Sequence, residues 1–101
     1  MTRVVISASA DADSAAILRD LYGKAGNRTV IKYRILLRQL YDRLAEYPES
    51  GVTRPVLGPN IRIGIVLPYI VIYEHVRATN LVTILRIVHG HRKISGKLLS
   101  D

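Results

Sequence analysis

The residues best suited to acid-base chemistry or anion binding lie near the end of the chain, in "ILRIVHGHRK" at positions 84–93. The stretch begins as an apolar, β-branched run and then carries five nitrogen-bearing side chains: Arg86, His89, His91, Arg92 and Lys93. Histidine can move protons near neutral pH, and arginine can grip a phosphate with two parallel hydrogen bonds. Three interpretations are possible. The stretch could be an active site, a docking surface, or a strand whose end is simply exposed to solvent.

Cleavage of RNA through its own 2′-hydroxyl needs a base for that hydroxyl, an acid for the leaving oxygen, and cations for the charge that develops on phosphate. Arg62 and Arg86 could be the cations, and His89 and His91 could supply the acid and the base. Residues two apart in a strand share a face, so alternation points both histidines away from Arg86. These four residues form one site only if the strand ends or bulges near Gly90.

Purely structural roles are open for the same side chains. Arg62 and Arg86 each lie within a β-branched run and could pair with Glu74 or another carboxylate, because buried charges need partners. His75 is expected to be an ordinary residue near a strand end. Since His89 and His91 have no cysteine and no convincing carboxylate nearby, we expect no metal site, and the sequence indicates no cofactor.

The length and composition favour one folded domain spanning residues 1–101. Apolar residues make up 49% of the chain and charged residues 23%, which is ordinary for a globular protein and excludes disorder. Fifteen Lys and Arg against eight Asp and Glu give a net charge of +7. That charge favours an anionic partner, which could be nucleic acid, an acidic protein segment or a membrane surface.

We find no targeting segment in the sequence, and we expect the protein in the cytoplasm. The absence of cysteine excludes disulfides and thiolate metal sites and is compatible with a reducing compartment. The start, "MTRVVISASADADSAA", lacks an apolar stretch long enough for a signal peptide. No run approaches the length of a membrane span, so we expect no membrane partner.

Local patterns predict a strand and two helices in the first half of the chain. Residues 3–8 form a short run rich in β-branched residues, which is typical of a strand. A helix should follow, with Ser9 as its cap, Asp11 and Asp13 at the positive end of its dipole, and Gly23 or Gly26 as its end. A second helix is expected from about residue 29 to residue 46, and the short turn between the two makes an antiparallel hairpin.

The second half of the chain predicts three antiparallel strands in a meander. Turn signals, Leu-Pro and "RATN", separate the runs "NIRIGIV", "PYIVIYEHV" and "LVTILRIVH". The whole chain therefore reads as an α+β fold with the order strand, helix hairpin, three-stranded antiparallel meander (β-α-α-β-β-β).

Both faces of this predicted sheet are apolar in the middle of its strands. In the last strand, strict alternation gives one face Leu81, Thr83, Leu85, Ile87, His89 and His91, and the other face Val82, Ile84, Arg86, Val88 and Arg92. Two helices can cover only one side of a sheet. The uncovered side is therefore a candidate partner surface, because large exposed apolar patches usually mark interaction sites.

The order of these elements, together with four stretches of sequence, resembles the RelE/ParE superfamily of bacterial toxin-antitoxin toxins. The stretches are "LYDRLAEYPESG" at 40–51, "RPVLGPNIRIG" at 54–64, "PYIVIYEH" at 68–75 and "VTILRIVHGHRKI" at 82–94. Each is degenerate alone, but their order and spacing are fairly specific, and the resemblance covers the chain from about Val4 to Ile94.

The resemblance implies a small toxin of a type II system, of the kind linked to plasmid stabilisation, held inactive in a hetero-oligomeric complex with a cognate antitoxin. A segment of that antitoxin would wrap the toxin and cover its apolar groove, and the positive charge of this chain suits an acidic segment. The antitoxin-binding residues expected from the sequence are Tyr69, Tyr73, Ile84, Arg86 and Val88. The target-binding residues expected from the sequence are Arg86, His89, His91, Arg92 and Lys93.

The superfamily divides by target, and this chain is closer to its ParE-like members. ParE-like toxins inhibit DNA gyrase without being nucleases, whereas RelE-like toxins cut messenger RNA on the ribosome. RelE-like toxins usually carry a tyrosine near the C-terminus, and this chain has none after Tyr73. A RelE-like endoribonuclease remains the alternative, and a third is a non-toxic relative that only binds its antitoxin and helps it regulate transcription.

Overall fold

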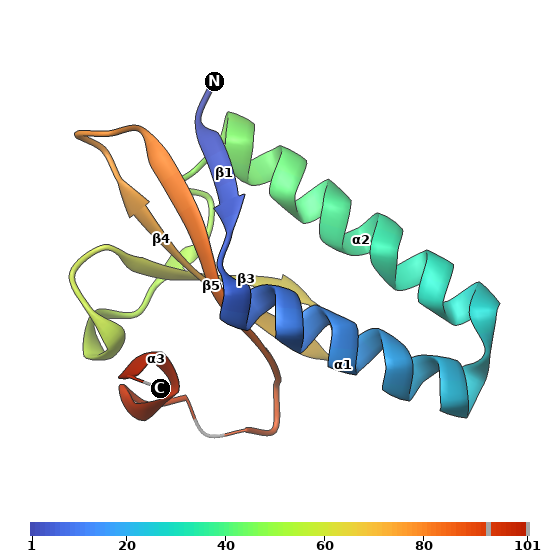
Figure 1. Ribbon diagram of the computed structural model, residues 1–101. Coiled ribbons are helices and arrows are strands. Elements are labelled where there is room, and N and C mark those ends of the chain that lie inside the picture. Colours follow the sequence, from blue (N-terminus) through green and yellow to red (C-terminus); the bar gives the residue numbers. More distant parts are fainter. Residues whose placement is uncertain (93, 101) are drawn as a thin grey trace.

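The computed structural model describes residues 1–92 and 94–100, and it has the expected α+β order (Figure 1). Lys93 lies outside the described residues. The elements in chain order are β1 (Arg3–Ile6), α1 (Ala8–Ala25), α2 (Asn27–Glu46), β2 (Val52–Thr53), a single 3₁₀ turn η1 (Pro55–Leu57), β3 (Ile61–Val66), β4 (Tyr69–Val76), β5 (Leu81–His89) and α3 (Lys97–Ser100). The predicted meander is confirmed, because β3, β4 and β5 pair as antiparallel neighbours.

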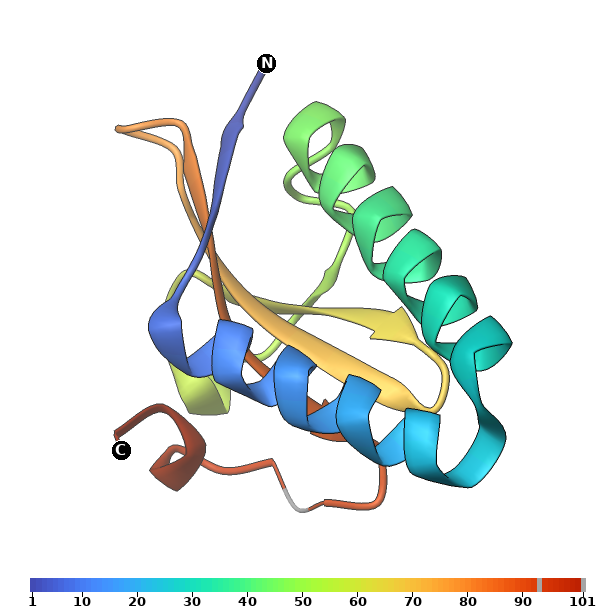
Figure 2. The same ribbon diagram turned by 45° about the vertical axis from the view of Figure 1, so that its right-hand side comes forward.

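The N-terminal strand joins the sheet beside the last long strand. The sheet has the order β1-β5-β4-β3-β2, and β1 runs parallel to β5 with Arg3 opposite Leu81 and Ile6 opposite Ile84. Parallel neighbours need a long crossover, which the helix hairpin provides. Figure 2 shows α1 and α2 on the same side of the sheet, meeting at their turn and diverging from it. Pairing of β1 with β5 therefore closes the domain.

Helix α1 begins earlier than the sequence suggested. Its cap is Ser7, whose Oγ accepts a hydrogen bond from the Ala10 N–H at 3.0 Å, so the prediction of Ser9 as the cap was wrong. Ser7 takes this place because its own N–H still belongs to the sheet, bonding to the Ile84 carbonyl at 2.9 Å. Gly26 ends the helix at φ 81°, a conformation that glycine adopts without steric cost.

The core between the helices and the sheet holds most of the large buried side chains. Its buried members are Ala10, Leu37, Leu40, Leu44, Val66, Tyr69, Val71, Tyr73, Val82, Ile84 and Ile87. The helix residues among them recur at three- and four-residue spacings on α2, and those of β4 alternate along the strand, as the two periodicities require.

The opposite face of the sheet is not bare. A second cluster forms there from Ile61, Ile63, Ile72, Val88 and Leu98, with Leu57, Ile70, Leu85, Ile94 and Leu99 packed against it. The expectation that nothing in the chain covers this face was wrong, because the segment after β5 returns across it and buries Leu98. The cover is small, since α3 is one turn long.

A β-bulge in β5 alters which side chains face the helices. Ile72 pairs with Arg86, but the next residue, Tyr73, pairs with Ile84, so Leu85 is an extra residue in β5. Strict alternation along residues 81–92 was therefore wrong. Val82, Ile84 and Ile87 all lie in the helix-side core, whereas Leu85, Arg86 and Val88 belong to the second face or its groove.

Two tyrosines with buried hydroxyls differ in how those hydroxyls are satisfied. The Tyr73 hydroxyl donates to the Pro48 carbonyl and accepts from the Gly51 N–H, both at 2.9 Å, and so holds the loop before β2. The Tyr41 hydroxyl is buried and has no hydrogen-bond partner among the described residues. Burial raises the pKa of Tyr41 to about 12, and the nearby Asp11 carboxylate adds to the effect.

Removal of the Tyr41 hydroxyl and removal of the Tyr73 hydroxyl should therefore change the free energy of unfolding in opposite directions. Tyr41→Phe deletes an unpaired buried group, whose burial costs about 1–3 kcal/mol, so the free energy of unfolding should rise by up to that amount. Tyr73→Phe leaves the Gly51 N–H unpaired, so the free energy of unfolding should fall by about 1–3 kcal/mol. Urea unfolding of the two variants measures both values. A loss of stability in Tyr41→Phe as large as that in Tyr73→Phe would show that the Tyr41 hydroxyl has a partner.

Candidate functional site

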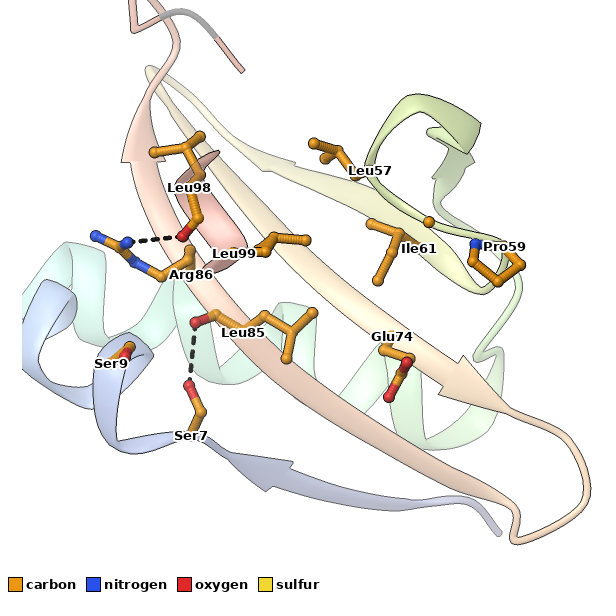
Figure 3. Close-up of a pocket in the computed structure, with 11 residues that line it drawn as sticks. Ser7, Ser9, Leu57, Pro59, Ile61, Glu74, Leu85, Arg86, Leu98 and Leu99 are labelled. Atoms are coloured by element: carbon orange, nitrogen blue, oxygen red, sulfur yellow. Dashed lines mark hydrogen bonds between the residues drawn. The ribbon is translucent and has the colours of Figure 1, made fainter. Parts of the chain in front are cut away.

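A groove of about 380 Å³ opens on the sheet face that lies away from the helix hairpin (Figure 3). Its lining residues are Ser7, Ser9, Leu57, Gly58, Pro59, Ile61, Glu74, Leu85, Arg86, Leu98 and Leu99. Leucine, isoleucine and proline side chains supply the apolar part of the walls, while Glu74 and Arg86 supply opposite charges from neighbouring strands. The groove therefore suits a mainly apolar peptide segment that carries some charge.

Arg86 ties three separate parts of the chain together at one side of this groove. Its Nε and Nη2 donate to the two carboxylate oxygens of Asp13 at 2.8 and 3.1 Å, and its Nη1 donates to the Leu98 carbonyl at 2.9 Å. The sequence left open that Arg86 pairs with Glu74 or another carboxylate, and the structure gives it Asp13 of α1. The guanidinium is therefore already engaged by helix α1 and by the C-terminal segment.

The early end of β1 leaves part of the β5 edge open to Asp13. Strand β1 ends at Ile6, so it pairs with only the first half of β5 and leaves the later half of that edge without a strand neighbour. Asp13 Oδ2 accepts the Ile87 N–H at 2.9 Å, which satisfies a backbone donor on that edge. A single carboxylate thus holds both the Arg86 side chain and the strand edge.

The five residues predicted to contact an antitoxin do not form one surface. Tyr69, Tyr73 and Ile84 belong to the core between the helices and the sheet, and the last two are fully buried. Arg86 and Val88 lie on the opposite face, and of the five only Arg86 lines the groove. The groove residues Leu57, Ile61 and Leu99 were not identified from the sequence. The two adjacent leucines of "KLLS" near the end of the chain were the available signal for Leu99.

The four residues that could have formed a nuclease site lie in different places. Arg62 Nη1 donates to the carbonyls of Glu49 and Gly51 at 3.0 and 2.9 Å, so its charge binds the loop before β2. Arg86 binds Asp13 on the second face of the sheet. His89 and His91 lie at and beyond the end of β5, and His89 contacts the helix-side residue Tyr69. The geometry does not assemble an acid, a base and two cations around one phosphate.

The two histidines take part in a column of rings at that end of the sheet. His91 stacks on His89 with ring centroids 4.7 Å apart and planes 14° apart, and the His91 N–H donates to His89 Nδ1 at 3.1 Å. His89 meets Tyr69 edge-to-face at 5.8 Å, and Tyr69 meets Tyr33 edge-to-face at 5.6 Å. Both histidines and Arg92 are exposed. The column therefore runs from the core into solvent.

A compact polar cluster near the end of β4 was missed by sequence reasoning. Arg77 donates to both carboxylate oxygens of Glu49 at 2.6 and 2.7 Å, and this hydrogen-bonded contact lowers the pKa of Glu49. His75 is only 8% exposed, and its Nδ1 lies 3.7 Å from Glu49 Oε2. The sequence suggested an ordinary strand-end residue, because a single histidine in an apolar run does not reveal a carboxylate 26 positions earlier.

Within residues 1–92 and 94–100 no group of three or more His, Cys, Asp or Glu could hold a metal ion. No helix in that part of the chain is both long enough and apolar enough to cross a membrane.

Comparison with known proteins identifies a family of similar sequences and solved structures of similar fold. The sequence model of a family described as "ParE toxin of type II toxin-antitoxin system, parDE" matches residues 4–94. A solved structure described as "Chromosomal ParDE TA system from P. aeruginosa" superimposes with a TM-score of 0.72 at 22% sequence identity, covering 88% of this chain and 96% of that one. No curated protein matches the sequence. At that identity the solved structure supports the fold alone, while the family match spans most of the chain.

Proposed function

The chain belongs to the ParE toxin family of type II toxin-antitoxin systems, and from this membership we propose that it inhibits DNA gyrase until a cognate antitoxin binds it. The family match over residues 4–94 is the observation that carries the proposal. The dispersal of Arg62, Arg86, His89 and His91 supports an inhibitor over a nuclease, because general acid-base catalysis needs its groups within hydrogen-bond reach of one substrate. We place this activity in the cytoplasm.

The proposed site for the antitoxin is the groove on the second sheet face. The segment after β5 covers part of this face with Leu98, and Leu57, Leu85 and Leu99 remain only partly buried. A bound antitoxin segment would complete that burial, which contributes roughly 25 cal/mol for each Å² of apolar surface removed from water. The net charge of +7 favours a segment that carries acidic residues between its apolar ones.

The proposed contact with gyrase is the exposed basic end at His89, His91 and Arg92, with Lys93 following in the sequence. Charges at the rim of an interface mainly alter association rate and salt dependence. Their contributions should be spread over several residues rather than concentrated in one catalytic group, whose removal typically costs roughly 100- to 10,000-fold in rate.

Expression without antitoxin should induce the DNA damage response before protein synthesis falls, because gyrase inhibition acts on DNA. A damage-responsive reporter and pulse labelling of new protein, followed in the same culture, give the order of events. Purified protein should also block supercoiling by gyrase in vitro, and Arg92→Ala should weaken that block modestly.

Other outcomes would point to the other activities. Discrete cuts in ribosome-bound message, mapped by primer extension and absent in His91→Ala, would establish an endoribonuclease instead. Normal growth with full expression, combined with stable antitoxin binding, would identify a non-toxic relative.

A further inference from the structure

We propose that the ring column at the end of β5 is a binding site for single-stranded nucleic acid, with one base stacking on His91. This inference goes beyond the proposed function, because it requires neither gyrase nor an antitoxin. It is based on the geometry of four rings and on the charges around them.

The column is held rigidly from the core outward. Tyr69 is 9% exposed and anchors the inner end, and its ring contacts Tyr33 on one side and His89 on the other. The Tyr33 hydroxyl donates to the Leu67 carbonyl at 3.1 Å, and this hydrogen bond fixes the Tyr33 ring against the turn between β3 and β4. His89 is thus placed by packing at the end of β5.

The outer end of the column presents a flat ring to solvent. The His91 ring lies nearly parallel to that of His89, and the hydrogen bond from the His91 N–H to His89 Nδ1 fixes the two residues relative to each other. His91 is exposed, and among the described residues it has no ring partner other than His89. A base that stacks there would extend the column by one more ring at little conformational cost.

The surroundings of the column favour a phosphate backbone. Arg92 follows His91 directly and is exposed, and Lys32 Nζ lies 5.8 Å from the Tyr33 ring centroid. The Asp20 carboxylate, which acts on Tyr69 electrostatically, is itself paired with Lys24 at 3.0 Å. Exposed rings interleaved with cations are the usual architecture of surfaces that bind single strands, because every base offers a π face while the cations follow the phosphates.

Single strands are favoured over duplex for a steric reason. In a duplex both faces of an internal base are covered by its neighbours, so a ring on the protein surface can stack only on an end or on an extruded base. An acidic protein segment would satisfy Arg92 and Lys32 equally well, but it would gain nothing from a stacked pair of imidazoles. Dependence on a ring at position 91 therefore separates the two kinds of ligand.

The test is fluorescence anisotropy of a labelled 12-nucleotide oligo-dT with the full chain, at several salt concentrations. His91→Ala should weaken binding by about fivefold to a hundredfold, the range expected for loss of one stacked base. His91→Phe, which keeps a flat ring, should retain most of the affinity. Arg92→Ala should reduce the slope of log affinity against log salt by about 0.7, the value for one phosphate contact on a single strand.

Arg3→Ala is the matched control for charge, because Arg3 is exposed and pairs with Leu81 at the opposite end of β5. It should change neither the affinity nor the salt slope, and a duplex of the same length should bind more weakly than oligo-dT. Equal losses in Arg92→Ala and Arg3→Ala with full affinity in His91→Ala would mean diffuse attraction by net charge, and the proposed site would be wrong. Absence of oligo-dT binding, whether or not His91→Ala impairs gyrase inhibition, would also overturn it. Because the anisotropy assay contains no gyrase, its failure is distinct from failure of the proposed function.

Discussion

Asp13→Ala is expected to lower the free energy of unfolding by about 1.5–3 kcal/mol, because it removes charge-assisted hydrogen bonds from a mostly buried ion pair. The Asp13 and Arg86 side chains are only 18% and 16% exposed, so water can replace the lost carboxylate only in part. The substitution also leaves the Ile87 N–H without its acceptor at 2.9 Å. Since small domains are stable by only about 5–15 kcal/mol, this single change should remove a large share of the total.

Asp20→Ala is the matched control, because it removes another carboxylate from the same helix. Asp20 is 58% exposed and pairs with Lys24 one turn later, and exposed pairs of this kind contribute about 0.3–0.5 kcal/mol. Urea unfolding of the two variants, with the slope of the transition compared, gives both values. Equal stabilities would mean that Arg86 is held by groups other than Asp13. Asp13→Asn should lose most of the same free energy, since a neutral amide removes the charge that Asp13 places against the guanidinium.

The sequence predicted Asp13 as a favourable charge at a helix start and allowed Arg86 to pair with some carboxylate, but it could not pair the two. They are 73 positions apart, and their contact depends on the parallel pairing of β1 with β5. Hydrophobic alternation reveals that a strand has buried faces, but it does not identify the neighbouring strand. The bulge at Leu85 is equally invisible to alternation, and it moves Leu85 and Arg86 onto the same side of the sheet.

The local predictions succeeded where the signal was local. The helix hairpin, the turns at Leu67–Pro68 and 77–80, and the order of the meander all follow from periodicity and turn residues within a few positions. The cover of the second face depended instead on Leu98, near the end of the chain, folding back across three strands. Two adjacent leucines in a short polar segment indicate burial, but they do not indicate against which surface.

The candidate site was predictable in composition more than in geometry. The spacing of His89 and His91 correctly placed them together, and alternation correctly turned His89 away from Arg86. It did not predict that the two imidazoles stack, because that depends on the chain turning at Gly90, whose N–H bonds to the Pro68 carbonyl at 2.8 Å. The roles of these residues toward gyrase or an antitoxin remain predictions.

Leu57→Glu should prevent tight binding of the antitoxin if the groove on the second sheet face is its docking site. Leu57 lines that groove from the 3₁₀ turn, opposite Leu98 and Leu99 (Figure 3). A glutamate there would place a carboxylate against the apolar part of the antitoxin segment and would also repel its acidic residues. Loss of a central apolar contact typically costs about 2 kcal/mol or more, so the dissociation constant should rise by roughly 30-fold or more. Isothermal titration calorimetry with the purified antitoxin measures this change.

Val56→Glu is the control that isolates the groove, because it introduces the same charge one residue earlier in the same turn. Val56 is 75% exposed and is not among the groove residues, so its substitution changes the net charge without altering the groove wall. It should shift the dissociation constant by only the small factor expected of one rim charge. Thermal unfolding of both variants must show that each remains folded at the temperature of the titration. If both folded variants bind the antitoxin as tightly as the unaltered chain, the docking surface lies elsewhere. Ile31 and Ile35 of α2 then become the residues to test, because they are large apolar side chains left exposed on the helix hairpin.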